Sequence, residues 1–392
     1  MNAGLDHDLL IVGGGPAGTS TALHLVREQG IRPDRVRLID KARFPRDKPC
    51  AGAVSQLGVD ALHALGLRVT VPSVRMRGVR VLFREAVGET SCAMGIVVRR
   101  TEFDAQLLDR ARTEGVQVRE GEAVRAIERI AGGYRVTTSV GSTTTRFVAA
   151  CDGAAGTTRK LLGLREPARK GHLYVLDTEP VAADRAVGRG LIDFDLSVIE
   201  DGLEGYYWDF PTVIDGKSYV SRGIYHANLT PSSDVKAVLG RALAKRGVDI
   251  ANVKLRPFST RPFVPGSTLA QEGVVLVGEA AGIDHATGEG IAQAIVMGAI
   301  AARHVARALR TGGSSFASYD DDVRTSNMGR HMLQSAWLAR RVYGRIGEPA
   351  RRLLLTSGYA RDAAMRWYNG ESLAWSTKAR LGLGLLTRVR PS

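Results

Sequence analysis

Residues 8–18 read Asp-Leu-Leu-Ile-Val-Gly-Gly-Gly-Pro-Ala-Gly, an apolar run followed directly by a glycine-rich turn. The run predicts a short buried strand, and residues 16–28 have the spacing of a helix. Gly13 permits a tight turn, Gly15 lets the backbone approach a pyrophosphate, and Gly18 lets helix and strand pack closely. The free N–H groups at the helix N-terminus favour phosphate. This arrangement predicts a dinucleotide site.

The next strand supplies an acid at the spacing that such a site requires. Residues 36–39 predict a second buried strand, and Asp40 follows it, 22 residues after Gly18. A carboxylate there can accept hydrogen bonds from ribose hydroxyls and disfavours a 2′-phosphate, so FAD or NAD suits the pocket better than NADP. A tight loop without a ligand is the alternative. We predict that the cofactor is bound here by Gly13, Gly15, Pro16, Ala17, Gly18, Asp40 and Lys41.

The composition is that of a globular chain with excess positive charge. The 392 residues carry a net charge of +14, and 44% of them are hydrophobic. The charge raises the alternative of nucleic-acid binding, but the arginines are spread along the chain and no nucleic-acid module is recognisable. Cys50, Cys92 and Cys151 are too widely spaced for a disulfide framework or a CxxC-type metal site. We therefore expect a cytoplasmic protein with no nucleic-acid partner and no metal.

The remaining elements predict an α/β fold with a discontinuous cofactor domain. No stretch reaches the roughly 18 apolar residues of a spanning helix, and the N-terminus does not read as a signal peptide. Helices are expected at 101–114, 233–247 and 290–310, and strands at 116–119, 123–130, 134–138 and 273–277. We predict a Rossmann-like cofactor domain over 1–70, 100–165 and 265–312, an inserted β-sheet substrate domain over 71–99 and 166–264, and a C-terminal helical extension over 313–392.

Two further segments resemble a known fold. Residues 150–159 read Ala-Cys-Asp-Gly-Ala-Ala-Gly-Thr-Thr-Arg, and residues 274–282 read Val-Val-Leu-Val-Gly-Glu-Ala-Ala-Gly. They resemble the D-G segment and the second FAD fingerprint of the p-hydroxybenzoate hydroxylase fold, and Arg100 looks like the flavin-contacting arginine of that fold. The resemblance implies FAD as the cofactor and adds Arg100, Asp152, Gly153, Gly278 and Glu279 to its site. The family has Asp at the position of Glu279. An ordinary turn acid is the alternative for Asp152.

Three more segments narrow the resemblance. Residues 45–52 are similar to the P-x-x-K-x-C-G-G segment of geranylgeranyl reductases, residues 206–211 match their Y-x-W-x-F-P segment, and residues 287–291 match their T-G-E-G-I loop. This chain departs from the family at Ala51, which replaces a glycine, and at His285, which replaces a proline. Both positions are expected beside the flavin ring, so they bear on the reaction that is catalysed.

The resemblance also suggests catalytic and substrate-binding residues. Cys50 and His285 are candidate proton donors near the flavin, and the alternatives are a small buried side chain in a turn for Cys50 and a structural histidine for His285. The residues Ala51, Gly288, Gly290 and Ile291, with Cys50, are expected beside the flavin. At the helix N-terminus near 290, N–H groups would favour the anionic reduced cofactor. Large rings at alternating strand positions, Tyr206, Trp208 and Phe210, are expected to line an apolar substrate cavity, with sheet core as the alternative.

The resemblance implies an FAD-dependent oxidoreductase that transfers hydride from reduced flavin to a C=C bond of an apolar, isoprenoid-like substrate. The altered residues keep open a monooxygenase or halogenase acting on a secondary metabolite or a peptide side chain, and a non-catalytic flavin-bound maturation partner is a minor alternative. Because there is no second Rossmann turn, electrons are expected from NAD(P)H or a small redox protein. The basic C-terminal helices suggest peripheral membrane contact.

Overall fold

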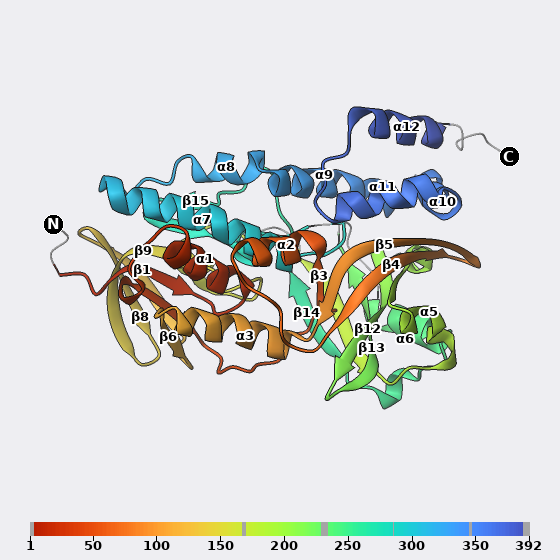
Figure 1. Cartoon of the computed structure of the whole chain (residues 1–392), viewed down its shortest axis with the longest axis horizontal. Helices are drawn as coiled ribbons and strands as arrows, with labels where there is room; N and C mark the ends of the chain where they lie inside the picture. Colours follow the sequence, from red (N-terminus) through yellow and green to blue (C-terminus); the bar gives the residue numbers. More distant parts are fainter. Residues whose placement is uncertain (1–3, 167–169, 229–233, 285, 345–346, 387–392) are drawn as a thin grey trace.

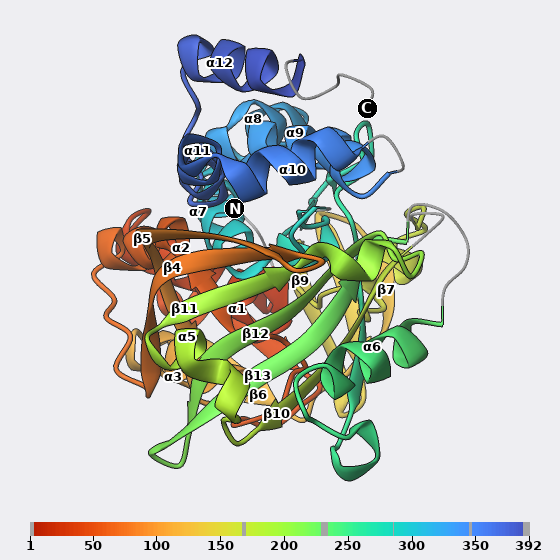
Figure 2. The same cartoon turned by 90° about the vertical axis from the view of Figure 1, so that its right-hand side faces the viewer.

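The computed structural model describes residues 4–166, 170–228, 234–284, 286–344 and 347–386. It consists of two β-sheets that lie side by side, with C-terminal helices running along both (Figure 1). Viewed from the side, the second sheet faces the reader and the C-terminal helices lie above it (Figure 2). No helix of the described residues is long and apolar enough to cross a membrane.

Sheet A contains β1 (His7–Val12), β2 (Val36–Asp40), β6 (Gln117–Glu120), β7 (Val124–Ile130), β8 (Gly133–Thr138), β9 (Gly141–Ala150), β15 (Ala270–Gln271) and β16 (Val274–Leu276). Its core is parallel, in the order β6–β2–β1–β9–β16. Leu9, Leu10 and Ile11 of β1 are all fully buried, as expected where a parallel sheet is covered on both faces.

Helices cover one face of the parallel core of sheet A, and the antiparallel strands β7 and β8 of the same sheet cover the other. The helices around this half of the molecule are α1 (Pro16–Arg27), α2 (Gln56–Ala64), α3 (Arg100–Thr113), the short α4 (Thr158–Leu161) and α7 (Ile291–Thr311). Residues of α1, α3 and α7 share one hydrophobic cluster with β1 and β9. The antiparallel strands β7 and β8 pack on the opposite face through Tyr134 and Val136. The cofactor turn is therefore held between two packed layers.

Sheet B contains β3 (Ala53–Ser55), β4 (Ser73–Phe83), β5 (Ala86–Val98), β10 (Gly171–Thr178), β11 (Leu191–Asp195), β12 (Gly205–Ile214), β13 (Lys217–His226) and β14 (Arg256–Thr260), in the order β14–β10–β13–β12–β11–β4–β5–β3. Successive side chains of β12 point to opposite faces. Tyr206 and Trp208 therefore lie on one face, and Tyr207 and Asp209 on the other, which α6 (Val235–Ala244) and the one-turn α5 (Arg185–Gly188) cover.

The C-terminal helices close the first of these faces. They are α8 (Tyr319–Thr325), α9 (Asn327–Val342), α10 (Glu348–Thr356), α11 (Gly358–Tyr368) and α12 (Trp375–Leu386). Ala339, Tyr343, Met365 and Tyr368 from this region share a hydrophobic cluster with the aromatic rings of β12. The helix α12 lies outermost in both views (Figures 1 and 2).

The predicted α/β fold class is confirmed, but some local predictions need correction. The helix expected at 233–247 ends at Ala244, because Gly247 adopts φ +76° and the N–H of Val248 donates back to the carbonyl of Leu243. The helix Gln56–Ala64 was not predicted. Residues Ala53–Ser55, inside the range predicted for the cofactor domain, pair with β5 of sheet B. The domain boundaries themselves stay a prediction.

Candidate functional site

The carboxyl ends of β1, β2, β9 and β16 meet at one edge of sheet A, where the strand order reverses between β1 and β9. Ligands of open α/β sheets bind at such switch points. A cavity of about 260 Å³ lies there, between the two sheets. Most residues predicted to bind the cofactor line it, namely Gly15, Pro16, Ala17, Asp40, Lys41, Cys50, Arg100, Asp152, Gly153, Glu279, Gly288, Gly290 and Ile291. We call it the cofactor cavity.

Gly13 and Gly18 do not line the cavity but shape the turn that does. Gly13 adopts φ +114°, and a side chain there would overlap with the carbonyl of Cys151. A side chain at Gly18 would overlap with the carbonyl of Gly13. The helix α1 begins after Gly15 without a side-chain cap, so its first N–H groups remain free to bind an anion. Gly278, with φ +63°, has a similar structural role against Ala17.

Asp40 is fixed at the end of β2 by the turn itself. Its carboxylate accepts hydrogen bonds from the N–H groups of Gly14 at 2.7 Å and Ala42 at 2.8 Å. A carboxylate has about four acceptor positions. Asp40 therefore keeps acceptor capacity toward the cavity that it lines, as a ribose-binding role requires.

Two arginines share one buried carboxylate at the phosphate end of the cavity. Arg100 donates twice to Asp104, at 2.7 and 2.6 Å, and Arg46 contacts the same carboxylate at 3.0 Å. Asp104 is fully buried. The second terminal nitrogen of Arg46 is buried and has no hydrogen-bond partner among the described residues. Because Arg46 lies beside Gly15, an unpaired guanidinium nitrogen and free helix N–H groups fit a diphosphate at this place.

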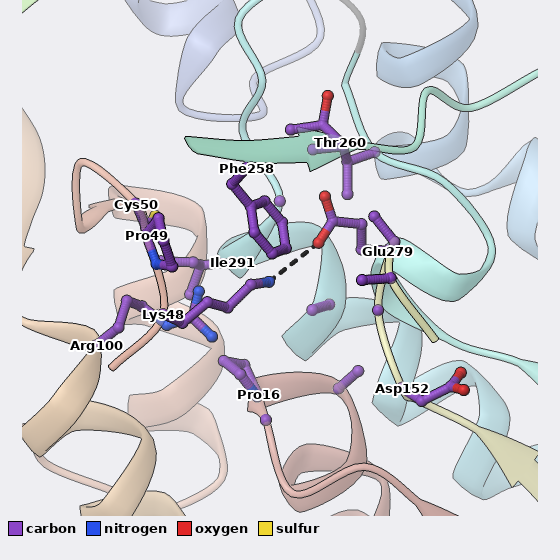
Figure 3. Close-up of a pocket in the computed structure, with 18 of the residues that line it drawn as sticks. Pro16, Lys48, Pro49, Cys50, Arg100, Asp152, Phe258, Thr260, Glu279 and Ile291 are labelled. Atoms are coloured by element: carbon purple, nitrogen blue, oxygen red, sulfur yellow. Dashed lines mark hydrogen bonds and ion pairs between the residues drawn. The ribbon is translucent and has the colours of Figure 1, made fainter. Parts of the chain in front are cut away.

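An ion pair spans the cavity. Lys48 of the loop after β2 contacts Glu279 at 3.0 Å, and its ammonium group lies 4.9 Å from the ring centre of Phe258 (Figure 3). Glu279 follows β16, while Phe258 and Thr260 belong to β14 of sheet B. The cavity wall therefore combines both sheets. The longer side chain of Glu279 faces the cavity, as the resemblance implied for the acid at this position.

The D-G segment after β9 is held by its own acid and by a buried arginine. Asp152 accepts hydrogen bonds from the N–H and the hydroxyl of Thr158, at 2.9 and 2.7 Å. Arg261, which follows β14, donates to the carbonyls of Gly153 at 3.1 Å and Ala280 at 3.4 Å. Because these carbonyls belong to two different cofactor loops, Arg261 ties the loops to each other and to sheet B.

Cys50 lies half-buried between the cofactor cavity and a smaller one. Its sulfur accepts a hydrogen bond from the N–H of Gly52 at 3.3 Å, and the side chain of Arg100 lines both cavities beside it. A second cavity of about 20 Å³, room for about one water, adjoins at Cys50, Lys48 and Arg100. Ala51 lines this second cavity and not the first.

The loop 284–290 leads into α7 and supplies Gly288 and Gly290 to the cavity. His285, predicted to be catalytic, lies outside the described residues. Two buried carboxylates anchor the loop. Asp284 is fully buried and contacts His331 at 2.8 Å, which helps to hold its pKa below the ordinary value although burial opposes this. Burial raises the pKa of Glu289 to about 7.

The three rings predicted to line a substrate cavity lie on sheet B, outside the cofactor cavity. Tyr206, Trp208 and Phe210 are buried and do not line the cofactor cavity. They contact Phe194 and Tyr225 edge-on or tilted and pack against the C-terminal helices. Tyr206 also donates a hydrogen bond to the carbonyl of Thr287. We call this surface the aromatic face of sheet B. Its contact with substrate stays a prediction.

Several residues of the site carry no local sequence signal. Phe258, Thr260 and Leu173 complete the cavity wall from sheet B, yet they lie in strands whose sequence reads as ordinary core. His331 and Tyr368 reach the cofactor loop from helices about 40 to 80 residues away in the chain. Alternation along the strand could have placed Phe258 and Thr260 on one face. The contacts of His331 and Tyr368 with loop 284–290 could not have been inferred from residue spacing.

Comparison with known proteins identifies an FAD-binding domain in this chain. Residues 6–199 match the family model described as FAD binding domain. The digeranylgeranylglycerophospholipid reductase of Thermoplasma volcanium is 26% identical over 381 residues, covering 87% of this chain and 89% of that protein.

Solved structures share the fold. A geranylgeranyl bacteriochlorophyll reductase-like protein of Thermoplasma acidophilum superposes with a TM-score of 0.73 at 20% identity, covering 97% of this chain and 100% of that one. The flavin-dependent brominase Bmp2 gives a TM-score of 0.71 at 16% identity, covering 98% of this chain and 100% of that one. The chain thus contains an FAD-binding domain and has a p-hydroxybenzoate hydroxylase-type fold, and its predicted resemblance to the geranylgeranyl reductase-like proteins is confirmed.

Proposed function

We propose that this FAD-dependent oxidoreductase saturates a carbon–carbon double bond of an apolar, isoprenoid-like substrate. The observation that carries the proposal is Cys50, a thiol at the wall of the cofactor cavity that Arg100 also lines. The relative that is similar over 87% of this chain is a lipid reductase, which supports the same class of reaction.

The residues of the cavity divide the work of holding FAD. The glycine turn, the α1 N-terminus and Arg46 would bind the diphosphate, Asp40 the ribose, and Asp152 and Glu279 the polyol chain. The N-terminus of α7, whose first residue Ile291 lines the cavity, contributes a partial positive charge there. When bound, FAD supplies the redox chemistry, because its reduced form donates hydride. The electron donor is proposed to be NAD(P)H or a small redox protein.

Cys50 supplies the second hydrogen in this proposal. Adding two hydrogens to an alkene requires one hydride and one proton, and the thiol can release a proton toward the cavity. The adjoining cavity of about 20 Å³ has room for one water that can return a proton to the sulfur. Ala51, in place of a glycine, narrows this second cavity and not the first.

The test is an anaerobic turnover. The purified protein is loaded with FAD, reduced with dithionite, and mixed with geranylgeraniol in the absence of oxygen. We expect reoxidation of the flavin and a product heavier by two hydrogens per reduced bond. Cys50→Ser should slow this reoxidation, whereas Cys92→Ser, a half-buried thiol away from the cavity, should leave it unchanged. No reoxidation by any isoprenoid probe would exclude the alkene reductase.

A second reaction, monooxygenation or halogenation of a secondary metabolite or peptide side chain, is favoured by the likeness to the brominase fold. In that case the reduced protein reacts productively only with oxygen. NAD(P)H oxidation that consumes oxygen and depends on an added aromatic substrate would select this alternative. A flavin that neither oxygen nor an alkene reoxidises productively would point to the non-catalytic maturation partner.

We also propose that the C-terminal helices contact an anionic membrane surface, from which an apolar substrate would be drawn. Residues 327–392 contain twelve Lys and Arg but three Asp and Glu. On α12, Trp375 is 82% exposed and Leu383 is 63% exposed, and Lys378 and Arg380 are exposed beside them. Exposed apolar and basic side chains on one outer helix suit the boundary between head groups and acyl chains.

Vesicle sedimentation tests the membrane proposal. We expect more protein to sediment with vesicles of phosphatidylglycerol than with vesicles of phosphatidylcholine, and less after Trp375→Ala. The matched control is Val140→Ala, which changes an apolar residue that is 71% exposed, in the turn between β8 and β9. Equal sedimentation of both variants, or no binding to either vesicle, would overturn the proposal.

A further inference from the structure

A buried carboxylate ties the cofactor loop to α9. Asp284 accepts hydrogen bonds from the N–H groups of Ala286 and Thr287, both at 2.7 Å. The same carboxylate contacts His331 at 2.8 Å and accepts from the hydroxyl of Ser335 at 2.5 Å. His331 and Ser335 both lie on α9, one turn apart. The start of the loop is therefore bonded to its own backbone and to α9 through one side chain.

A second carboxylate ties the end of the loop to α11. Glu289 is buried and accepts a hydrogen bond from the N–H of Ala292, in the first turn of α7, at 2.9 Å. Its other oxygen accepts from the hydroxyl of Tyr368, the last residue of α11, at 3.2 Å. Glu289 thus caps α7 with one oxygen and binds α11 with the other. Gly288 and Gly290, on either side of it, line the cofactor cavity.

Two tyrosines hold the middle of the same loop. Tyr343, which follows α9, donates to the carbonyl of Ala286, and Tyr206 of β12 donates to the carbonyl of Thr287. Trp367 stacks on the imidazole of His331, with ring centres 4.0 Å apart. Every contact is buried or half-buried. Four side chains from the C-terminal helical region, His331, Ser335, Tyr343 and Tyr368, thus contact the described part of the cofactor loop.

We propose that α9 and α11 are a working part of the cofactor site, in which His331, Ser335 and Tyr368 are positioning residues that fix Gly288 and Gly290 through Asp284 and Glu289. The proposal goes beyond the reaction proposed above, since it concerns how the cofactor is held and is the same for a reductase or a monooxygenase. It rests only on FAD being the ligand of the cavity.

The position of Glu289 also predicts how the site responds to pH. Burial raises the pKa of Glu289 to about 7, while the hydrogen bond from Tyr368 and the proximity of His331 act to lower it and Asp284 acts to raise it. Asp284 of the loop, His331 of α9 and Tyr368 of α11 are thus the charged and titratable groups that face Glu289. Tyr206 and Tyr343 face Asp284 instead. Ionised Glu289 offsets the positive end of α7, so FAD should bind more weakly above pH 7.

The experiment measures FAD dissociation constants of the full chain by fluorescence between pH 5.5 and 8.5. Tyr368→Phe and Ser335→Ala should each weaken binding about 5- to 10-fold, because each removes a hydrogen bond to a carboxylate. Ser335→Ala also removes the hydroxyl that accepts from the N–H of Ala286 at 2.9 Å. Tyr368→Phe should also move the inflection of the pH profile upward, because the lost bond stabilised the charged form of Glu289. Glu289→Gln should remove the inflection.

The matched control is Tyr359→Phe, which removes a hydroxyl from the exposed start of the same helix α11. It should bind FAD like the unaltered protein. A general loss of packing would weaken binding without moving the inflection. The proposal is overturned if Tyr368→Phe and Ser335→Ala match the control in affinity and in pH profile. If the unaltered protein binds no FAD, the assignment of FAD to the cavity fails. If the unaltered protein binds FAD but the variants match the control, only the positioning roles fail.

Discussion

At the carboxyl-terminal edge of sheet A, turns and charged side chains leave a cavity open, whereas on the aromatic face of sheet B the C-terminal helices fill the space with side chains. The first surface presents free N–H groups and an unpaired arginine nitrogen. The second presents rings that already contact one another and α9 to α11. The edge of sheet A can therefore bind an anionic cofactor, whereas the aromatic face of sheet B is packed against helices.

The two surfaces meet at loop 284–290. Its glycines line the open cavity, and its carboxylates and carbonyls are bonded to residues of the covered face, among them Tyr206 and Tyr368. A substrate that approaches from the aromatic face must therefore pass this loop or shift the helices above it. The comparison predicts that changes at the edge act on cofactor binding first, whereas changes at the covered face act through the loop.

The largest expected effect is at Gly13. Gly13→Ala places a methyl group against the carbonyl of Cys151 at φ +114°, so we expect a loss of about 4 kcal/mol or more and a protein that retains no FAD. The matched control is Gly132→Ala, which has φ +79° but open space around it and should lose only about 1–2 kcal/mol. Flavin absorbance after gel filtration distinguishes them. Equal flavin content in both would refute the role of the turn.

The next effect concerns Asp104, the buried partner of two arginines. Asp104→Leu leaves Arg100 buried without its carboxylate, which should cost about 3–5 kcal/mol of unfolding free energy in urea. Asp109→Leu, an exposed acid on the same helix α3, is the control and should change stability by about 0.5 kcal/mol or less. If the two variants unfold at the same urea concentration, the shared carboxylate does not stabilise the edge.

The edge and the covered face also differ in how far their sequences predict them. The turn around Gly13, the acid at Asp40 and the segment around Asp152 are local patterns, because each forms within one strand and the turn that follows it. Parallel strands then bring their ends together without further information. The bonds from Asp284 to His331 and from Glu289 to Tyr368 join residues 47 and 79 positions apart, and no periodicity encodes such a pairing.

The aromatic face shows the same limit. The alternation of Tyr206, Trp208 and Phe210 correctly places three rings on one side of a strand, since side chains alternate along it. Whether that side holds a cavity or a covering helix depends on α9 and α11, more than 100 residues later in the chain. Strand periodicity assigns a face, but only the packing of distant elements decides what lies against it.

At the junction, Glu289 predicts a pH dependence of stability. Its pKa rises from 4.5 in the unfolded chain to about 7 in the folded protein, so the folded state binds more protons between these values. Unfolding free energy should therefore fall as pH rises through this window, by about 3 kcal/mol in total, with the loss complete above pH 7. In Glu289→Gln this contribution should be absent at pH 5 and at pH 8.

Urea unfolding of both proteins at the two pH values measures the difference. Glu371→Gln, an exposed carboxylate near the end of α11, is the control and should keep the pH dependence of the unaltered protein. If Glu289→Gln loses as much stability between pH 5 and pH 8 as the unaltered protein does, Glu289 does not link the loop to proton binding.

The smallest expected effect lies on the aromatic face, where two neighbouring residues of β12 make a matched pair. The indole N–H of Trp208 is buried without a hydrogen-bond partner among the described residues, whereas the hydroxyl of Tyr207, on the opposite face, donates to Asp209 at 2.6 Å. Trp208→Phe removes an unpaired donor and leaves a small void, so these effects offset and stability should change by about 1 kcal/mol or less. Tyr207→Phe breaks a bond to a carboxylate and should cost about 1.5–3 kcal/mol. If urea unfolding reverses this order, the indole N–H has a partner in solution, and a group that reaches it must enter between sheet B and α11.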